Sequence, residues 1–229
     1  MIPLKDNVPT RHFPIVTVGL IVANVLVYFL YQAPDLEGSI AQLAYQPCEV
    51  NNSCPVTGED WPITSFTALF MHGNIVHLGG NMLFLWIFGN NVEDAMGRVR
   101  YVAFYLLAGY AATALQTVVT LWMSPGSAGI PNLGASGAIS GVLGAYFVLL
   151  PRAKVLTVFL LGIIFFLREV PAVFFLGVYV LFQLWDAGFQ FLHPPEGGGV
   201  AVFAHLGGLA FGVLAVFLFR QRAPLRPQY

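Results

Sequence analysis

Charged residues are scarce in this sequence. Asp, Glu, Lys and Arg account for 9% of its 229 residues, whereas soluble domains contain about 25%. No charged residue occurs between Tyr101 and Pro151, a stretch long enough for two membrane crossings of about 20 residues each. Because so few charges cannot cover a water-exposed surface, the composition excludes a soluble enzyme and a disordered chain and predicts a polytopic membrane protein.

Two other features are nearly absent. The sequence has no basic tract and no nucleic-acid-binding motif, and its net charge is −1, so we expect no nucleic acid partner. It has only two cysteines, Cys48 and Cys54, which excludes a disulfide-rich secreted module. Both lie in the loop Pro34–Met71, where they either form one bridge or stay unpaired, and the sequence leaves both alternatives open.

The charge-poor segments predict an all-α fold, a polytopic membrane bundle of six transmembrane helices. The predicted spans are Phe13–Pro34, His72–Val92, two within Tyr101–Pro151 that a loop at residues 124–134 separates, Val170–Leu192 and Gly198–Phe219. The apolar segment Val155–Leu167 would cover only about 20 Å as a helix. Since the hydrocarbon core is about 30 Å thick, we interpret this segment as interfacial.

Basic residues set the orientation of this bundle. With six spans and a cytoplasmic N-terminus, all 10 Lys and Arg residues lie on the cytoplasmic side, as the positive-inside rule requires. The sequence therefore predicts a cytoplasmic N-terminal segment (residues 1–12), a six-span membrane domain (residues 13–219) and a cytoplasmic C-terminal tail (residues 220–229).

Polar residues within three of the predicted spans indicate a site. His77 and Asn81 share one helical face, Ser136 begins the fourth span, and His205 lies in the sixth. His77, Ser136 and His205 are each 15 or 16 residues from a charged residue at the cytoplasmic boundary, which corresponds to about 22–24 Å of helix. Because polar groups are costly in a membrane and these lie at one level, we expect a single site near the outer surface.

Small residues accompany these polar groups. Ser136, Ser140 and Gly144 repeat every four residues, as do Gly208 and Gly212 in the sixth span. Such faces let two helices approach closely in lipid, which would bring a serine hydroxyl within reach of an imidazole. For the glycines alone, ordinary helix packing is the alternative interpretation.

The polar residues favour nucleophilic catalysis. Ser136 is the expected nucleophile and His205 the expected base, and the start of the fourth helix supplies N–H groups where an oxyanion would form. His77 and Asn81 can donate further hydrogen bonds to that oxyanion. No acidic residue is placed to orient His205, so the sequence predicts a Ser-His dyad rather than a triad.

A metal site is the main chemical alternative, and the motifs do not favour it. The sequence contains no His-Glu-x-x-His motif, which a helical zinc site would present. We therefore interpret His72 and His193 as polar loop or interface residues and expect no metal.

The ordered set of motifs resembles the rhomboid family of intramembrane serine proteases. The motifs are His77-x-x-x-Asn81, Gly134-Ala135-Ser136-Gly137 and Ala204-His205-x-x-Gly208-x-x-x-Gly212, and Glu93-x-x-x-Gly97 is also similar to the family pattern. The similarity extends from about Trp61 to Phe219.

This resemblance implies roles for the site residues. Ser136 matches the family's nucleophile and His205 its base, while Asn81 and His77 match the residues that bind the oxyanion together with the backbone N–H of Ser136. The family cleaves peptide bonds in or beside transmembrane segments of other membrane proteins, within the lipid bilayer and without a metal or cofactor. The six-span layout is most similar to bacterial and archaeal members, which implies a prokaryotic plasma (inner) membrane. The oligomeric state stays open.

The fifth span is the expected entry route for a substrate helix. It offers Phe174, Phe175, Tyr179, Phe182 and Trp185, bulky side chains that could part without breaking a polar network. The alternative interpretation, that these side chains simply face lipid, is equally compatible with the sequence.

Two other functions are alternatives to a protease. One is a non-enzymatic relative of the same fold, and the presence of both Ser136 and His205 argues against it. The other is a small transporter, which would predict a repeat between the two halves of the chain, and the sequence shows none.

Overall fold

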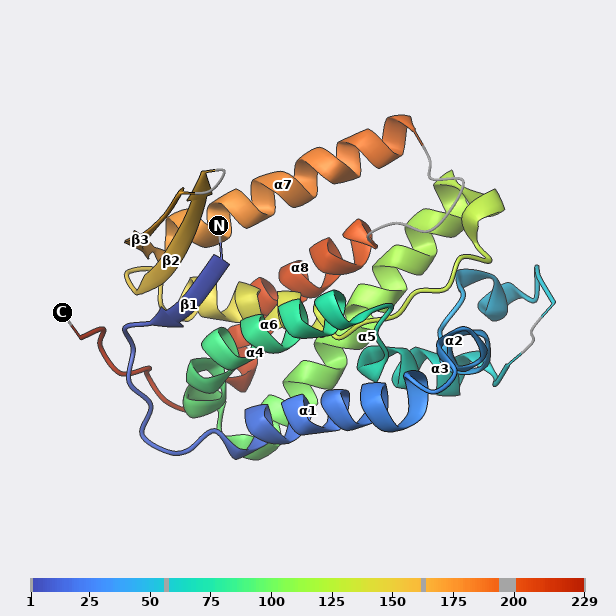
Figure 1. Cartoon of the computed structure of the whole chain (residues 1–229). Helices are drawn as coiled ribbons and strands as arrows, with labels where there is room; N and C mark the ends of the chain where they lie inside the picture. Colours follow the sequence, from blue (N-terminus) through green and yellow to red (C-terminus); the bar gives the residue numbers. More distant parts are fainter. Residues whose placement is uncertain (1, 56–57, 162–163, 194–200, 229) are drawn as a thin grey trace.

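The computed structural model describes residues 2–55, 58–161, 164–193 and 201–228 and shows a mostly helical chain. Its long helices are α1 (Ile15–Leu26, continued by a π-helical segment, Val27–Gln32), α4 (Ile75–Met96), α5 (Arg98–Met123), α6 (Ser136–Leu149), α7 (Ala172–Leu192) and α8 (Val202–Phe219). Helix α6 lies in the centre of the bundle, packed against α4, α5 and α8, while α7 runs along one edge (Figure 1).

Most of these helices have the composition of membrane spans. Within the described residues, four helical segments are long and apolar enough to cross a bilayer: Ile15–Gln32, Arg98–Met123, Ala172–Gln190 and Val202–Phe219. Helix α6 is apolar but has only 14 residues. The six long helices occupy the stretches predicted as spans, and the predicted start of the last span, Gly198, lies outside the described residues. This composition is that of a multi-pass membrane protein.

The prediction of an all-α fold is wrong in two places, at the start of the chain and after α6. A three-stranded antiparallel sheet forms there, with the order β1 (Ile2–Asp6), β2 (Lys154–Leu161), β3 (Ile164–Pro171). In β2, Val155 and Thr157 are fully buried on one face, which is the alternation of a strand. The described residues of the predicted interfacial segment Val155–Leu167 therefore lie in the antiparallel strands β2 and β3 rather than in a helix, and residues 162 and 163 are not described. The place of this segment at a membrane interface stays a prediction.

Glycines bring α6 and α8 into close contact. A Cβ atom on Gly208 would collide with the carbonyl oxygen of Gly137, and a Cβ atom on Gly212 would collide with that of Gly141. The predicted close approach at Gly208 and Gly212 is thus confirmed.

The face of α6 in this contact differs from the predicted one. Gly144 does face α8, where its added Cβ would meet the Leu209 carbonyl oxygen. Ser140 turns instead toward α7, where its hydroxyl lies 2.8 Å from the Tyr179 hydroxyl. The repeat of small residues on α6 therefore serves two neighbouring helices rather than one.

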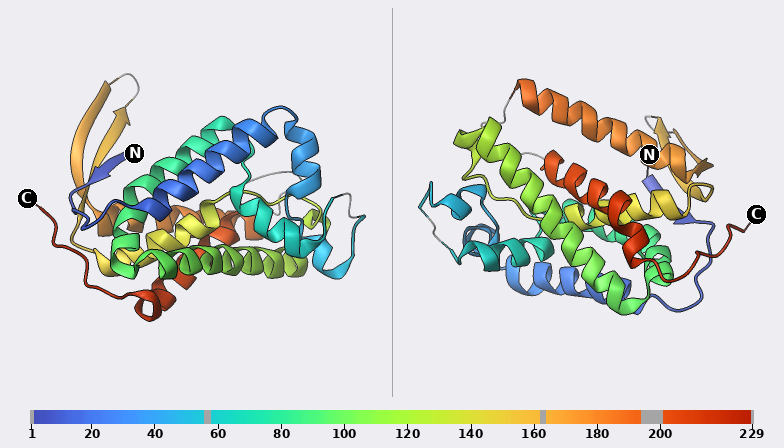
Figure 2. Two further views of the ribbon diagram at one scale, coloured as in Figure 1. Left: turned by 90° about the horizontal axis from the view of Figure 1, so that it is seen from below. Right: turned by 180° about the vertical axis from the view of Figure 1, so that it is seen from behind.

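Carboxylates that are buried or partly buried hold the end of the bundle that carries both chain termini and the sheet, which we call the termini end (Figures 1 and 2). The Glu93 carboxylate of α4 accepts hydrogen bonds from the backbone N–H groups of Val16 and Thr17 and from the Thr17 hydroxyl, at 2.8–3.0 Å. Helix α1 has no side-chain cap at its N-cap residue. Glu93 therefore supplies the acceptors that the first turn of α1 needs.

A second carboxylate ties β1 to the bundle. Asp6 accepts hydrogen bonds from the Tyr146 hydroxyl at 2.6 Å and from the Asn91 amide at 2.7 Å. Burial raises the pKa of Asp6 to about 6, because desolvation of the charged form outweighs the opposing effect of the Tyr146 hydrogen bond. Close by, Asp94 forms an ion pair with Arg11 at 2.6 Å.

The loop between α1 and α4 is folded and covers the opposite end. It contains α2 (Leu36–Leu43), α3 (Trp61–Thr67) and two short 3-10 helices, Pro47–Asn51 and Ala68–Phe70. A disulfide joins Cys48 to Cys54, so the alternative of unpaired cysteines is excluded. On α3, Trp61, Ile63 and Phe66 are exposed, which gives this loop an apolar outer surface.

Candidate active site

Ser136 and His205 form a hydrogen bond between α6 and α8. The Ser136 Oγ atom lies 2.8 Å from Nε2 of the His205 imidazole, and both side chains are partly buried. Ser136 is the first residue of α6 and His205 lies in the first turn of α8, so the close contact at Gly208 brings the two groups together. An imidazole nitrogen at this distance can take the hydroxyl proton, and the pair can therefore generate a nucleophile.

The backbone before Ser136 requires glycine. Gly134 has a φ of +129°, which residues with a side chain rarely adopt. A Cβ atom at this position would lie 2.8 Å from the His77 ring. The chain can therefore pass beside His77 and turn directly into α6. The first N–H groups of α6 have no acceptor within their own helix, and they place positive potential beside the Ser136 hydroxyl.

His77 and Asn81 of α4 line the same cavity as Ser136 and His205, with a volume of about 580 Å³. The structure thus brings together all four predicted site residues. Asn74 caps α4 by accepting a hydrogen bond from the His77 backbone N–H at 2.8 Å, which fixes the start of that helix.

Asn81 has a donor without an acceptor. Its side chain is 8% exposed, and its Nδ2 group has no hydrogen-bond partner within the described residues. An unsatisfied buried donor costs free energy, so a hydrogen-bond acceptor that enters the cavity would gain from reaching it.

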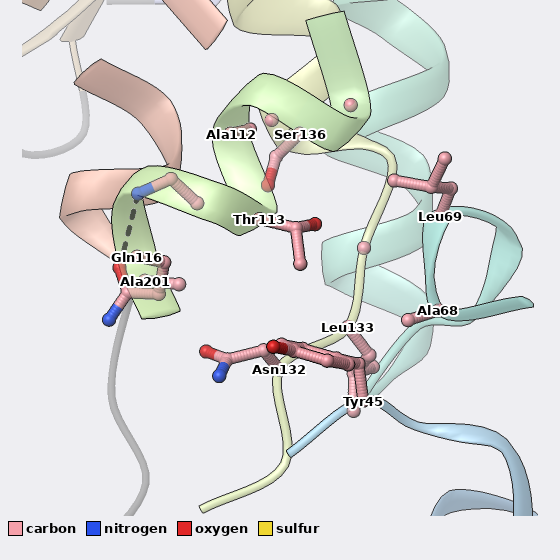
Figure 3. A pocket seen from close by; sticks show the side chains of 14 residues that line it. Tyr45, Ala68, Leu69, Ala112, Thr113, Gln116, Asn132, Leu133, Ser136 and Ala201 are labelled. Atoms are coloured by element: carbon pink, nitrogen blue, oxygen red, sulfur yellow. Dashed lines mark hydrogen bonds between the residues drawn. The ribbon is translucent and has the colours of Figure 1, made fainter. Parts of the chain in front are cut away.

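Two glutamines that the sequence analysis did not identify orient the His205 helix. The Oε1 atom of Gln183, on α7, lies 3.2 Å from Nδ1 of His205. The Oε1 atom of Gln116, on α5, accepts a hydrogen bond from the Ala204 backbone N–H at 3.1 Å, at the start of α8 (Figure 3). Both were detectable in principle, because a carboxamide inside an apolar span is as unexpected as a histidine.

His72 lies in a different environment from the predicted polar loop or interface. Its side chain is fully buried, and its ring meets the His77 ring edge-on at a centroid distance of 5.0 Å. Gln32 holds the His72 backbone by accepting from its N–H at 2.8 Å and donating to its carbonyl oxygen at 3.1 Å. His193 packs on Phe189, with ring centroids 4.7 Å apart.

No metal cluster accompanies these histidines in the described parts of the chain, where no three or more His, Cys, Asp or Glu side chains lie together in a way that could hold an ion.

A second, smaller cavity lies beside Ser136 (Figure 3). Its volume is about 40 Å³, and its wall combines the small side chains of Ala68 and Ala112 with the polar ones of Thr113 and Gln116. At about 10–15 Å³ for each water, it has room for a few water molecules or for one small side chain.

Helix α7 is the predicted entry route for a substrate helix, and it exposes only some of the five bulky side chains named for that role. Phe174, Phe182 and Trp185 are 58%, 67% and 79% exposed, whereas Phe175 is buried. Tyr179 hydrogen-bonds Ser140 of α6. The prediction that these side chains could part without breaking a polar network is therefore wrong, since Tyr179 is hydrogen-bonded to Ser140 of α6.

Comparison with known proteins supports the sequence resemblance. Residues 59–222 match a family model described as the Rhomboid domain. The chain is 28% identical over 217 residues to "Presenilin-associated rhomboid-like protein, mitochondrial" of Homo sapiens, covering 90% of this chain and 50% of that protein. It is 31% identical over 204 residues to "Rhomboid protein 1, mitochondrial" of Saccharomyces cerevisiae (86% and 51%). It is 26% identical over 247 residues to "RHOMBOID-like protein 1" of Arabidopsis thaliana (95% and 55%).

The chain spans about half the length of the curated relatives it matches. These relatives are mitochondrial and plant proteins, so the comparison does not favour the bacterial and archaeal form that the six-span layout suggested. The domain match covers most of the chain and includes His77, Asn81, Ser136 and His205. The chain therefore belongs to the rhomboid family.

Proposed function

We propose that this chain is an intramembrane serine endopeptidase that hydrolyses peptide bonds in or beside transmembrane segments of other membrane proteins. The observation that carries this proposal is the 2.8 Å hydrogen bond between Ser136 Oγ and His205 Nε2. That pair lines one cavity together with His77 and Asn81. Membership of the rhomboid family supports the same reaction.

In the proposed reaction Ser136 is the nucleophile and His205 the general base. Ser136 Oγ bonds to the scissile carbonyl carbon while its proton moves to His205 Nε2, which leaves a negative charge on the carbonyl oxygen. The intermediate then collapses, the C–N bond breaks, and His205 gives its proton to the leaving amine. A water molecule, deprotonated by the same nitrogen, attacks the acyl-enzyme, releases the carboxylic product and restores Ser136.

The oxyanion of each tetrahedral intermediate lies beside donors that the resting chain leaves open. The backbone N–H of Ser136 is at the start of α6, and the Asn81 amide has no acceptor within the described residues. His77 lines the same cavity. Donors already in place stabilise charge that develops in the transition state without a further cost of reorientation.

The smaller cavity suggests a substrate preference. It borders Ser136 and is lined by small side chains such as Ala68 and Ala112. A small residue next to the scissile bond could fit there, whereas a large aromatic side chain could not. The scissile segment must also leave its helix, because helical carbonyls are held in backbone hydrogen bonds. We therefore expect substrates with a small residue at the cut and Gly or Pro nearby.

The proposed arrangement in the membrane has six spans (residues 13–219) and both termini on one side. Helix α6 has 14 residues and would cover only about 21 Å of a core about 30 Å thick. A helix that begins at Ser136 and ends at the opposite surface therefore places this serine below the membrane surface. A prokaryotic plasma membrane as the location rests on the six-span layout alone.

Cleavage by the reconstituted protein tests the proposal. The purified chain should cut a membrane protein with one transmembrane segment in liposomes, and Ser136→Ala should cut none. The control is Ser140→Ala, which removes a hydroxyl one turn away on the same helix and should leave cleavage within about twofold of the unmodified chain. Cleavage by folded Ser136→Ala would refute the nucleophile assignment.

A further inference from the structure

The imidazole of His205 has a hydrogen-bond partner at each of its two nitrogens. Nε2 lies 2.8 Å from Ser136 Oγ on α6, and Nδ1 lies 3.2 Å from Gln183 Oε1 on α7. The histidine itself is on α8. One ring therefore joins three helices, and its orientation depends on all of them.

The chemistry of these partners selects one tautomer. A neutral imidazole carries one N–H donor and one lone-pair acceptor. A carboxamide oxygen can only accept a hydrogen bond. Because the Gln183 oxygen is the partner of Nδ1, the imidazole proton must be on Nδ1. The lone pair is then on Nε2 and faces Ser136. In the opposite tautomer Nε2 would carry a proton and could not take the one from the hydroxyl.

We propose that Gln183 is a positioning residue that holds His205 in the tautomer and orientation required to deprotonate Ser136. This inference rests on the proposed function and adds a third member to the predicted pair. Gln183 would act through His205 and need not touch the substrate.

A neutral amide suits this position better than the carboxylate of soluble serine proteases. An ionised carboxylate inside a membrane carries a large desolvation cost, whereas an amide oxygen accepts the same hydrogen bond without a net charge. Asp186 is one turn further along α7 and is engaged elsewhere, since it accepts a hydrogen bond from Gln190 at 3.2 Å.

The position of Gln183 also links the base to α7. This helix runs along one edge of the bundle (Figure 1), and Leu181 and Phe182 on it are each 67% exposed. Its contacts with the other helices include the hydrogen bond that Gln183 accepts from His205 and the hydrogen bond between the Tyr179 and Ser140 hydroxyls. Displacement of α7 would release Nδ1, so the base would be fully oriented only while α7 is docked.

The rate at which a fluorophosphonate modifies Ser136 tests this role independently of substrate entry. Gln183→Met keeps the length of the side chain but removes the acceptor, and we expect labelling to slow by roughly 10- to 100-fold, part of the loss that a wrong tautomer causes in soluble serine proteases. Gln183→Glu restores an acceptor oxygen and should label at least ten times faster than Gln183→Met. In cleavage assays the loss should appear in kcat with KM nearly unchanged.

Two controls separate this role from simple docking of α7. Gln190→Met makes the same change two turns away, and Ser140→Ala removes the hydrogen bond between α6 and Tyr179 of α7. Both variants should label within about twofold of the unmodified chain. Labelling of Gln183→Met at the unmodified rate would overturn the inference, as would an equal loss in Ser140→Ala. Absence of any labelling in the unmodified chain would instead contradict the proposed function.

Nitrogen-15 NMR of the unmodified chain provides a test that needs no Gln183 variant to fold. With the His205 signals assigned by their loss in His205→Ala, Nδ1 should be protonated and Nε2 unprotonated at neutral pH. A proton on Nε2 instead would show that Gln183 presents its NH₂ group to the ring, and would refute the inference.

Discussion

The two ends of the bundle use buried polar groups in different ways. At the termini end, the carboxylates of Glu93 and Asp6 accept hydrogen bonds from α1, α4 and α6, and each joins segments far apart in the sequence. At the other end, Ser136 and His205 border a cavity of about 580 Å³, and Asn81 keeps a donor without an acceptor in the described residues.

The residues that stabilise the fold and the residues proposed to carry out the reaction therefore lie at different ends of the bundle. The Glu93 carboxylate lowers the free energy of the folded chain, because its donors would otherwise be buried without partners. A polar group that faces a cavity contributes little to folding and remains available to a ligand. Substitutions at the two ends should therefore have different signatures: loss of rate at the cavity and loss of stability at the termini end.

The largest effect is expected at the proposed base. His205→Ala removes the group that accepts the Ser136 proton, and cleavage should fall by about 10³- to 10⁶-fold, while the melting temperature in detergent changes little. A rate within tenfold of the unmodified chain would show that another group deprotonates Ser136.

A smaller effect on rate is expected from the unsatisfied donor. Asn81→Ala should lower kcat by about 10- to 1,000-fold, the range for loss of one oxyanion donor. Removal of a buried amide without an acceptor should leave the chain equally or more stable. Strong destabilisation in unfolding measurements, together with an unchanged rate, would contradict this role of Asn81.

Glu93→Ala should show the opposite signature. It leaves the N–H groups of Val16 and Thr17 and the Thr17 hydroxyl without their acceptor, at a cost of about 2–4 kcal/mol. Denaturant unfolding in micelles measures this loss, and the activity of each folded molecule should stay within about twofold.

The control for Glu93 is Glu169→Ala at the same end. Glu169 is 58% exposed and pairs with Lys154 at 3.4 Å, so its loss should cost less than about 1 kcal/mol. Equal destabilisation by both variants would mean that burial of the Glu93 carboxylate contributes nothing.

A further expected effect at the termini end is a pH dependence of stability at Asp6. Burial raises its pKa from 3.8 to about 6 in the folded chain, so between about pH 4 and pH 6 the folded chain holds a proton that the unfolded chain has released. Stability from this group is therefore greatest below about pH 4, decreases as the pH rises through this window, and is constant above it. Asp6→Asn cannot ionise and should remove this slope, which thermal unfolding at several pH values would detect as a difference on the order of a few degrees. An identical slope in Asp6→Asn and the unmodified chain would contradict the assignment.

The residues of the site were predictable from the sequence because membranes make polar groups conspicuous. His77, Asn81, Ser136 and His205 stand out in apolar segments, and the glycines of α8 indicated where helices approach. Gln183 was not predicted, although burial of an amide in an apolar span is also costly.

The sheet was not predictable in the same way. A largely apolar segment of 13 residues such as Val155–Leu167 shows neither helical nor strand periodicity clearly. The pairing of β2 with β1 joins residues about 150 positions apart. Such long-range pairing depends on tertiary structure, which local patterns do not contain.

The proposed pair of Ser136 and His205 is tested most directly by locating the adduct of a fluorophosphonate by peptide mass spectrometry in the detergent-solubilised chain. We expect modification at Ser136 alone, and loss of that modification in His205→Ala. Modification that persists at the same rate without His205, or that falls on another serine, would contradict this proposal.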